Sequence, residues 1–239
     1  MFRMRLHRFY TTLSLQKSQS ITLSDVGLLH QMRSVFRFHS GDTVILFNGD
    51  GNDYVSEIVS IDKSEAVFRV THSSVNQWKP SVKLTLAVSM IKKDSFEWVV
   101  QKATELGASE IIPLISERSE KKGWNRERAE KIIIEACEQS GRSDVPTLGE
   151  LTPLFDFIDR EKRKIIVFHT SGSRFDLSPD PRSNLVVKEI VALVGPEGGW
   201  SEKEIEMFHE KNFSIMHLST PVLRAETAAI AITSLILAK

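Results

Sequence analysis

Residues 191–204 read VALVGPEGGWSEKE, and this stretch decides the fold class. Its apolar beginning, residues 191–194, is typical of a buried β-strand. The glycines that follow allow tight turns and a close approach of the backbone to a ligand. Ser201 and Glu204 have the spacing of a capping box, which predicts a helix directly after the turn. A strand, a loop and a helix in succession are the unit from which parallel α/β sheets are built.

The same alternation extends through the chain from residue 83 onward. Residues 94–106 and 125–140 predict helices, because apolar side chains recur at helical spacing and a glycine follows each segment. We expect Asp94 and Glu97 to form a capping box at the start of the first helix. The segments that predict strands are KLTLAVSM (83–90), EIIPLI (110–115), KIIVFH (164–169), IVALVG (190–195) and FSIMHLS (213–219). Strands alternating with helices predict an α/β domain with a parallel sheet.

The N-terminal part has a different pattern. Short β-type runs, TVILFN (43–48), YVSEIVSI (54–61) and AVFRV (66–70), are separated by Asn and Gly turn signals. This pattern predicts a small antiparallel sheet or barrel. Because the following stretch is polar and ends in proline, we expect one domain over residues 1–73 and a second over residues 74–239.

Composition narrows the class of protein. The 239 residues are 41% hydrophobic and 26% charged, which excludes disordered, collagen-like and membrane proteins. The net charge is zero, yet residues 1–40 carry six Arg or Lys against one Asp, a net charge of +5. That end is a basic module suited to nucleic acid. The lone Cys137 and the absence of a secretion signal indicate a cytoplasmic protein.

The last segment, residues 225–238, is apolar on nearly every face. It is shorter than the roughly twenty residues that span a bilayer. We therefore expect a buried helix, packed either within the chain or against a second subunit.

The glycine loop has the geometry of an anion site at a helix N-terminus, but its charge argues against one. Glu197, Glu202 and Glu204 surround the turn. This favours a ligand with hydrogen-bond donors and a positive centre over a pyrophosphate. In HLSTPVLRAETAAIAI (217–232), Arg224 and Glu226 begin the last helix after another predicted strand end. Since ligands bind at the carboxyl ends of parallel strands, the two loops are expected to share one pocket.

These motifs resemble the ribosomal RNA uridine-N3 methyltransferase family (the RsmE family) of the SPOUT superfamily, which acts on 16S ribosomal RNA of the small subunit. The resemblance rests on VGPEGGWSEKE (194–204), VLRAETAAIAI (222–232), HRFY (7–10), RSVFR (33–37), GDTVILFNGDG (41–51), QKATELGASEIIP (101–113), ERS (117–119) and EACEQSGRSDVP (135–146). It implies a PUA-like RNA-binding β-barrel, then an α/β domain whose chain end forms a trefoil knot. It also implies a homodimer, and no metal or membrane partner.

The resemblance further implies the cofactor S-adenosyl-L-methionine and a set of site residues. The cofactor pocket would be lined by Leu193, Gly195, Gly198, Gly199, Leu218 and Leu223, with Glu197 facing ribose hydroxyls or fixing the loop. Arg224 would stabilise the anionic base. Glu226 would be a base or an orienting group. RNA contacts would come from Arg5, Arg8, Arg33, Arg37, Arg118 and Arg142.

One departure and two alternatives accompany this interpretation. Family members often have glycine and a basic residue in the last knot loop, where this chain has Ser219 and Pro221. A ribose 2′-O RNA methyltransferase is one alternative, although VLRAETAA lacks the asparagine of that signature. A non-catalytic ribosome-assembly RNA-binding protein of the same fold is the other.

Overall fold

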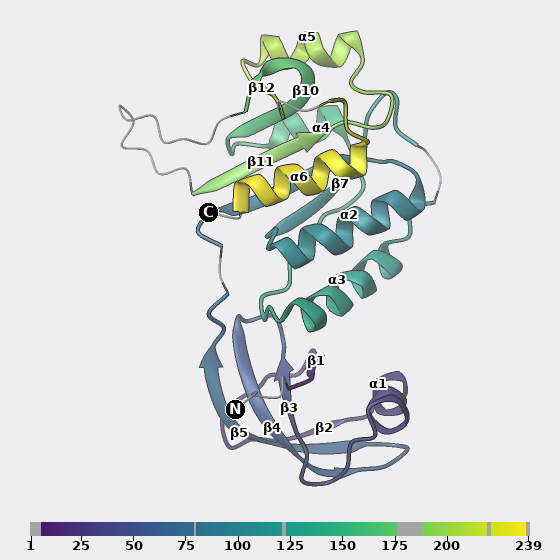
Figure 1. The fold of residues 1–239 in the computed structure, drawn as a ribbon, viewed down its shortest axis with the longest axis vertical. Helices are drawn as coiled ribbons and strands as arrows, with labels where there is room; N and C mark the ends of the chain where they lie inside the picture. Colours follow the sequence, from purple (N-terminus) through teal and green to yellow (C-terminus); the bar gives the residue numbers. More distant parts are fainter. Residues whose placement is uncertain (1–5, 79, 121–122, 176–187, 219–220, 238–239) are drawn as a thin grey trace. The chain divides into compact units, whose positions relative to one another are not determined.

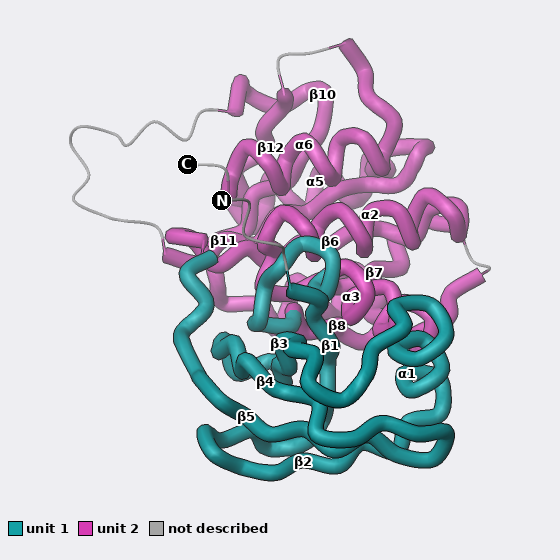
Figure 2. The backbone as a smooth tube through the Cα atoms, turned by 60° about the horizontal axis from the view of Figure 1, so that its bottom comes forward, with its two compact units in different colours: residues 1–78, 137–145 teal, residues 79–136, 146–239 magenta. Residues whose placement is uncertain are grey.

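The structure is a computed structural model that describes residues 6–78, 80–120, 123–175, 188–218 and 221–237. The chain divides into two compact units (Figure 2). Unit 1 contains residues 1–78 together with residues 137–145, and unit 2 contains residues 79–136 and 146–239. The first unit therefore includes a short segment from far along the chain.

Unit 1 is built on a five-stranded sheet with the order β1-β3-β4-β5-β2 (Figure 1). Its strands are β1 (Arg8–Tyr10), β2 (Ser20–Leu23), β3 (Thr43–Phe47), β4 (Asn52–Ile61) and β5 (Ala66–Val75). β1 runs parallel to β3, and the other pairs are antiparallel, as predicted for the three longest strands. Two register shifts between β4 and β5 allow these long strands to bend around a core, because bulges curve a sheet.

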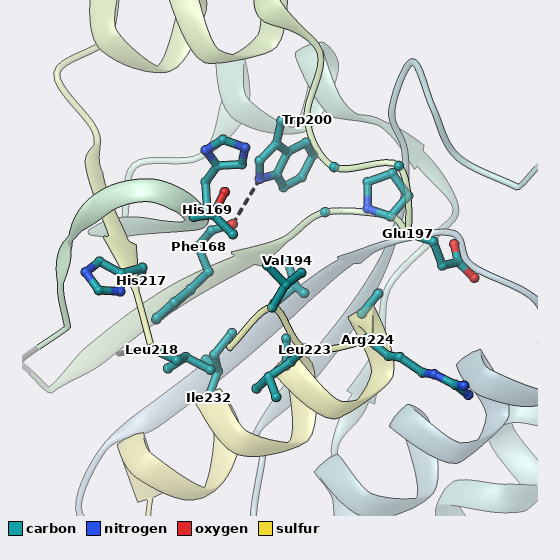
Figure 3. A pocket seen from close by; sticks show the side chains of 18 of the residues that line it. Phe168, His169, Val194, Glu197, Trp200, His217, Leu218, Leu223, Arg224 and Ile232 are labelled. Atoms are coloured by element: carbon teal, nitrogen blue, oxygen red, sulfur yellow. Dashed lines mark hydrogen bonds between the residues drawn. The ribbon is translucent and has the colours of Figure 1, made fainter. Parts of the chain in front are cut away.

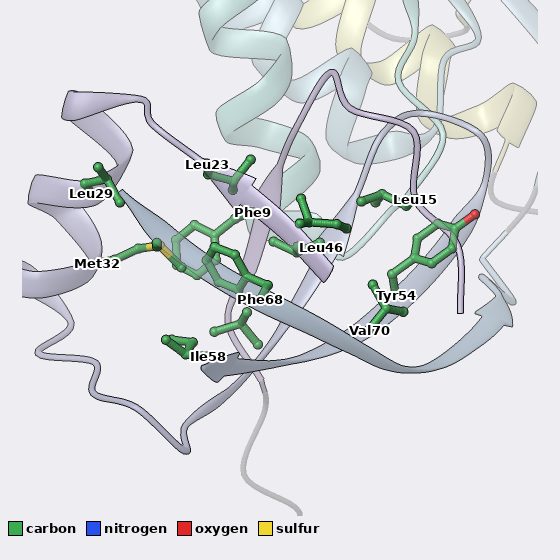
Figure 4. Packing of buried hydrophobic residues seen from close by; sticks show 13 residues of the cluster. Phe9, Leu15, Leu23, Leu29, Met32, Leu46, Tyr54, Ile58, Phe68 and Val70 are labelled. Carbon is green, nitrogen blue, oxygen red and sulfur yellow. The ribbon is translucent and has the colours of Figure 1, made fainter. Parts of the chain in front are cut away.

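The core of unit 1 lies on the concave side of this sheet (Figure 4). Leu46, Ile58 and Phe68 alternate with outward residues along β3, β4 and β5 and are fully buried. A short helix, α1 (Val26–His30), continues into a π-helical turn, η1 (Gln31–Val35), which adds Met32 to the cluster. Asp25 caps α1 by accepting a hydrogen bond from the Leu28 amide at 2.8 Å.

Unit 2 contains a parallel sheet with the order β12-β10-β11-β6-β7-β8, and β9 pairs with β7. All its pairs are parallel, which confirms the predicted sheet type. The strands are β6 (Lys83–Ser89), β7 (Glu110–Ile115), β8 (Thr147–Leu148), β9 (Thr152–Pro153), β10 (Ile165–Arg174), β11 (Glu189–Val194) and β12 (Ser214–His217). The most buried strands, β6 and β11, lie at the centre.

The helices of the chain after residue 90 are α2 (Lys93–Leu106), α3 (Arg126–Ser140), α4 (Leu154–Arg160), α5 (Glu202–Glu210) and α6 (Ala225–Leu237). α6 packs on β6 and β11 and against α2 (Figure 1). α4 and α5 pack Phe157 and Phe208 into a separate cluster with Val191 and Leu193 of β11. Because strand side chains alternate between faces, helices cover both faces of the sheet.

The predicted limits of α2 need one correction. Gly107 ends the helix with a φ of 102°, as expected for a glycine C-cap. The predicted capping box of Asp94 and Glu97 is wrong, because the helix already begins at Lys93 and its N-cap residue makes no side-chain hydrogen bond. Glu97 instead pairs with Arg128 at 3.4 Å.

The last helix is covered on one side only. Ala229, Ile232 and Ile236 are buried within the chain, whereas the side chain of Leu235 is 52% exposed. Packing within the chain therefore accounts for part of the apolar surface of α6 and leaves the rest open.

Candidate active site

A cavity of about 700 Å³ opens at the carboxyl ends of β11 and β12 and beside the middle of β10, where its pairing with β11 stops at Phe168 (Figure 3). This volume lies within the range of roughly 300–1,000 Å³ that is usual for small-molecule sites. β12 lies at the edge of the sheet, whereas α6, the next helix, lies on the central strands β6 and β11. Residues 221–224, which lead into α6, therefore lie beside the strand ends. The lining residues are Phe168, His169, Thr170, Val194, Gly195, Pro196, Glu197, Gly198, Gly199, Trp200, Met216, His217, Leu218, Pro221, Val222, Leu223, Arg224, Ala225, Ala228 and Ile232.

The glycine loop forms one wall of this cavity. Gly199 has a φ of 68°, a left-handed conformation that other residues rarely adopt. A Cβ atom on Gly195 would lie 3.1 Å from the ring of Trp200. The indole Nε1 of Trp200 donates to the Phe168 carbonyl at 3.2 Å, shown as a dashed line in Figure 3. The buried indole thus ties the loop to β10 at Phe168, the last residue of that strand that pairs with β11.

Glu204 holds the start of α5 and is almost fully buried. Its carboxylate accepts a hydrogen bond from the Ser201 amide at 2.8 Å, and the Ser201 hydroxyl accepts one from the Glu204 amide at 3.3 Å. The predicted capping box is confirmed. Because Ser201 and Glu204 already occupy amides at this helix end, they reduce its capacity to bind a phosphate.

Two further contacts brace the glycine loop. The carboxylate of Glu197, at the cavity rim, accepts from the Lys92 amide at 3.3 Å. The guanidinium of Arg118 donates to the carbonyls of Gly198 at 2.9 Å and Trp200 at 3.3 Å. In this structure Glu197 and Arg118 both help to fix the loop.

The opposite wall comes from the segment that leads into α6. Leu223 and Ile232 present apolar side chains to the cavity, while the side chain of Arg224 extends away from them (Figure 3). Arg224 is exposed, and within the described ranges no carboxylate lies within ion-pair distance of it. Glu226 is half-buried in the first turn of α6 and is not one of the lining residues. Among the described residues, Arg224 is therefore a cation without a carboxylate partner at the edge of the cavity.

Two histidines line the cavity that sequence reasoning did not assign to it. His169 and His217 each stand at the end of a β-type run in the sequence. That position at a predicted strand end could have indicated that they line the cavity. His169 Nδ1 lies 2.7 Å from the hydroxyl oxygen of Ser171. Burial lowers the pKa of His169, so its imidazole is uncharged at neutral pH.

Most of the cofactor residues expected from the sequence come together here. Those that line the cavity are Gly195, Glu197, Gly198, Gly199, Leu218 and Leu223. Leu193 differs, because it is fully buried in the cluster beneath the sheet and Val194 lines the cavity in its place. Pro221 is a lining residue, and Ser219 is outside the described residues.

The arginines expected at RNA differ in exposure. The guanidinium of Arg8 is buried and binds both carboxylate oxygens of Asp53, at 3.1 and 2.7 Å. Burial alone would raise the pKa of Asp53, but hydrogen bonds from Arg8, Ser143 and Asn76 outweigh it and hold that pKa below its usual value. Arg142 is likewise buried and pairs with Asp144 at 2.5 Å. RNA contact by Arg8 or Arg142 stays a prediction.

Two further arginines that were expected at RNA are more accessible. Arg33 is half-buried on η1, and Arg37, just after it, is exposed. Arg5 is outside the described residues. RNA contact by Arg33 and Arg37 also stays a prediction.

Comparisons with known proteins identify the family. Residues 78–237 match the RNA methyltransferase domain, and residues 32–71 match the RNA methyltransferase PUA domain. The chain is 31% identical to ribosomal RNA small subunit methyltransferase E of Rickettsia conorii, over 95% of this chain and 93% of that protein. The chain belongs to the ribosomal RNA small subunit methyltransferase E family. The family's PUA-like domain and α/β methyltransferase domain, both expected from the sequence, are confirmed.

Other members of the methyltransferase E family support the same assignment. The member from Bacillus subtilis is 30% identical, with 93% of each chain covered. The structure of the member from Neisseria gonorrhoeae, which is bound to S-adenosyl methionine, is 28% identical and superposes with a TM-score of 0.86 over 97% of this chain and 96% of that one. Among the described residues, no helix is long and apolar enough to cross a membrane, and no group of three or more His, Cys, Asp or Glu side chains could hold a metal ion.

Proposed function

We propose that this protein transfers a methyl group from S-adenosyl-L-methionine to N3 of one uridine in 16S ribosomal RNA of the small ribosomal subunit. The observation that carries the proposal is the cavity at the ends of β11 and β12 and beside β10. It is walled by the glycine loop and by residues 221–224, and Arg224 lies at its edge with no carboxylate partner among the described residues. A relative of the same family binds S-adenosyl methionine.

The residues of the cavity fit this cofactor. Val194, Leu223 and Ile232 provide an apolar surface for an adenine ring, and the backbone of the glycine loop provides polar groups beside it. Glu197 places a negative charge at the rim, which suits a ligand that carries a sulfonium. When bound, S-adenosyl-L-methionine supplies an electrophilic methyl group.

Arg224 has the chemistry that the acceptor base requires. As the imide proton of uridine leaves, negative charge grows on N3 and on the two flanking carbonyl oxygens. The guanidinium remains protonated and presents donors in one plane, so Arg224 stabilises this anion and orients the base. Glu226, in the first turn of α6, then acts as the proton acceptor or as an orienting group. Correct placement of the reactants contributes several kcal/mol in itself, so a strong base is not essential.

The basic N-terminal domain is proposed to hold the RNA. In this proposal residues 1–73 form the PUA-like RNA-binding domain and residues 74–239 the SPOUT domain. Phosphate contacts fix the register of the RNA and do not read its sequence. We assign these contacts first to Arg5, Arg33, Arg37 and Arg118, and only second to Arg8 and Arg142, which are buried. The proposed partner is 16S ribosomal RNA within the small subunit, in the cytoplasm.

A homodimer and a trefoil knot belong to the same proposal. The half-open apolar side of α6, with Leu235 52% exposed, supports burial against a second copy. The return of residues 221–237 from the sheet edge to the central strands β6 and β11 supports a threaded chain end.

The test uses purified protein, isotope-labelled S-adenosyl-L-methionine and small subunits from cells that lack the protein. We expect one uridine to gain a methyl group at N3, as mapped by mass spectrometry of nucleosides and by primer extension. Methylation of a ribose 2′ oxygen would replace the proposal with the first alternative. Subunits that bind the protein but gain no methyl group would favour the assembly factor.

A further inference from the structure

Three aromatic rings lie together at the edge of the core of unit 1. The centroid of the His7 ring lies 4.3 Å from that of Phe36 and 5.5 Å from that of Phe38. Phe36 and Phe38 are 5.7 Å apart. Phe9 is fully buried beneath them, with its ring 5.8 Å from Phe36 and 6.1 Å from Phe38. We call His7, Phe36 and Phe38 the aromatic platform.

The platform is supported from below and open above. His7 is exposed, and Phe36 and Phe38 are only partly buried against the core. Since side chains alternate along an extended segment, His7 and Phe9 both lie on the side of Phe36 and Phe38, whereas Arg8 between them points to Asp53. The rings are therefore fixed by a packed core and still present an accessible edge.

A strained residue sets the position of the two phenylalanines. Arg37 lies between them with a φ of 57°, a conformation that non-glycine residues rarely adopt. The Phe38 amide donates to the Met32 carbonyl at 3.0 Å, which closes the end of η1 in the manner of a helix C-cap. This reversal lets Phe36 and Phe38 approach His7 together and leaves the Arg37 side chain exposed beside them.

We propose that the aromatic platform binds an unstacked base of single-stranded RNA, with Arg37 contacting the adjacent phosphate. The inference rests on the RNA substrate of the proposed function and adds a site to it. Proteins recognise unpaired RNA by stacking its bases on aromatic side chains, and a neighbouring cation neutralises the backbone. A duplex offers no free base face, so the platform selects an unpaired segment.

The test measures binding of the full chain to a single-stranded RNA of about twelve nucleotides that carries 2-aminopurine at its centre. The fluorescence of 2-aminopurine falls when the base stacks on an aromatic ring. We expect His7→Ala and Phe38→Leu each to abolish this quenching and to raise the Kd about fivefold or more, with an unchanged salt dependence. Phe155→Leu, which alters a 53% exposed ring on α4, is the matched control and should bind as the unaltered protein does.

Arg37→Gly separates charge from stacking. Glycine accepts the backbone conformation at this position, so the variant loses the cation without new strain. We expect it to reduce the slope of log Kd against log salt concentration by about one, the value for one lost phosphate contact, while the quenching persists.

Calorimetry with S-adenosyl-L-methionine on every variant keeps this site distinct from the methyl-transfer site. The platform is rejected if the His7→Ala protein, whose altered side chain is exposed, keeps its cofactor affinity and binds the RNA as before. It is also rejected if affinity for a duplex of the same composition falls by the same factor. If stacking depends on the platform but no subunit is ever methylated, the proposed function fails and the platform stands.

Discussion

The carboxylate of Glu204 accepts a hydrogen bond from the backbone amide of Glu117, 2.9 Å away and 87 residues earlier in the chain. The same carboxylate caps α5 through Ser201. The next residue after Glu117 is Arg118, which donates to the carbonyl of Gly198. The loop after β7 and the glycine loop are therefore held together at both ends of the turn.

Glu204→Ala is expected to destabilise the protein by about 1–2 kcal/mol, because it removes a helix cap and leaves a buried amide without its acceptor. It should also weaken binding of S-adenosyl-L-methionine, since the wall of the cavity loses a brace. Urea unfolding and calorimetry measure the two effects. Glu202→Ala, an exposed carboxylate in the same turn, should change neither, and equal effects of the two substitutions would contradict this role.

Arg224→Ala is expected to lower the rate of methyl transfer about 100-fold or more, the usual cost of losing a donor that stabilises a developing anion. Affinity for the cofactor and the mass of the protein in solution should be unchanged, because the side chain is exposed. Single-turnover rates with small subunits test this. Arg224→Lys keeps the charge without the planar donors and should recover only part of the rate. An Arg224→Ala protein as fast as the unaltered one would remove Arg224 from the mechanism.

Asp53→Asn is expected to lower the stability of the protein by about 2 kcal/mol at pH 7, because it leaves the buried Arg8 without its counter-charge. Since the folded-state pKa of Asp53 is held below that of the unfolded chain, this stabilisation is present above about pH 4 and is lost as the pH falls through the folded pKa. Unfolding curves of the two proteins should converge below pH 4. The exposed Glu65→Gln substitution is the control, and a constant difference at all pH values would contradict the ion pair as the cause.

Affinity for S-adenosyl-L-methionine is expected to fall at acid pH, once the pH drops through the pKa of His169, which lies below the ordinary histidine value of about 6.5. Burial lowers the pKa of His169, so protonation is unfavourable there and adds a positive charge to a cavity that would hold a cation. His169→Gln should remove most of this loss, and the demethylated cofactor should lose less affinity. His217→Gln, on the other histidine of the wall, is the control. If His217→Gln removed the pH effect and His169→Gln did not, His169 would be excluded as its cause.

The longer elements of the chain were predictable because their patterns repeat. The apolar spacing of α2 and the strand EIIPLI (110–115) match the observed limits closely. β1, β2, α1 and α4 were not predicted, since each is too short to show a period. The capping box predicted at Asp94 failed because the helix begins one residue earlier, at Lys93, whereas the one predicted at Ser201 is present.

The sequence by itself determined the class of the fold, the two loops at strand ends and the residue types of the site, because these follow from local periodicity and short motifs. Only the tertiary structure decided which partner each charged side chain has. Glu197 and Glu204 bind backbone amides of distant loops, and Arg8 and Arg142 are buried in ion pairs. Arg224 has no carboxylate partner in the part of the chain that the structure describes. Such roles depend on which groups meet across the fold. A donor that is buried away from water needs an acceptor, and a nearby carboxylate supplies it.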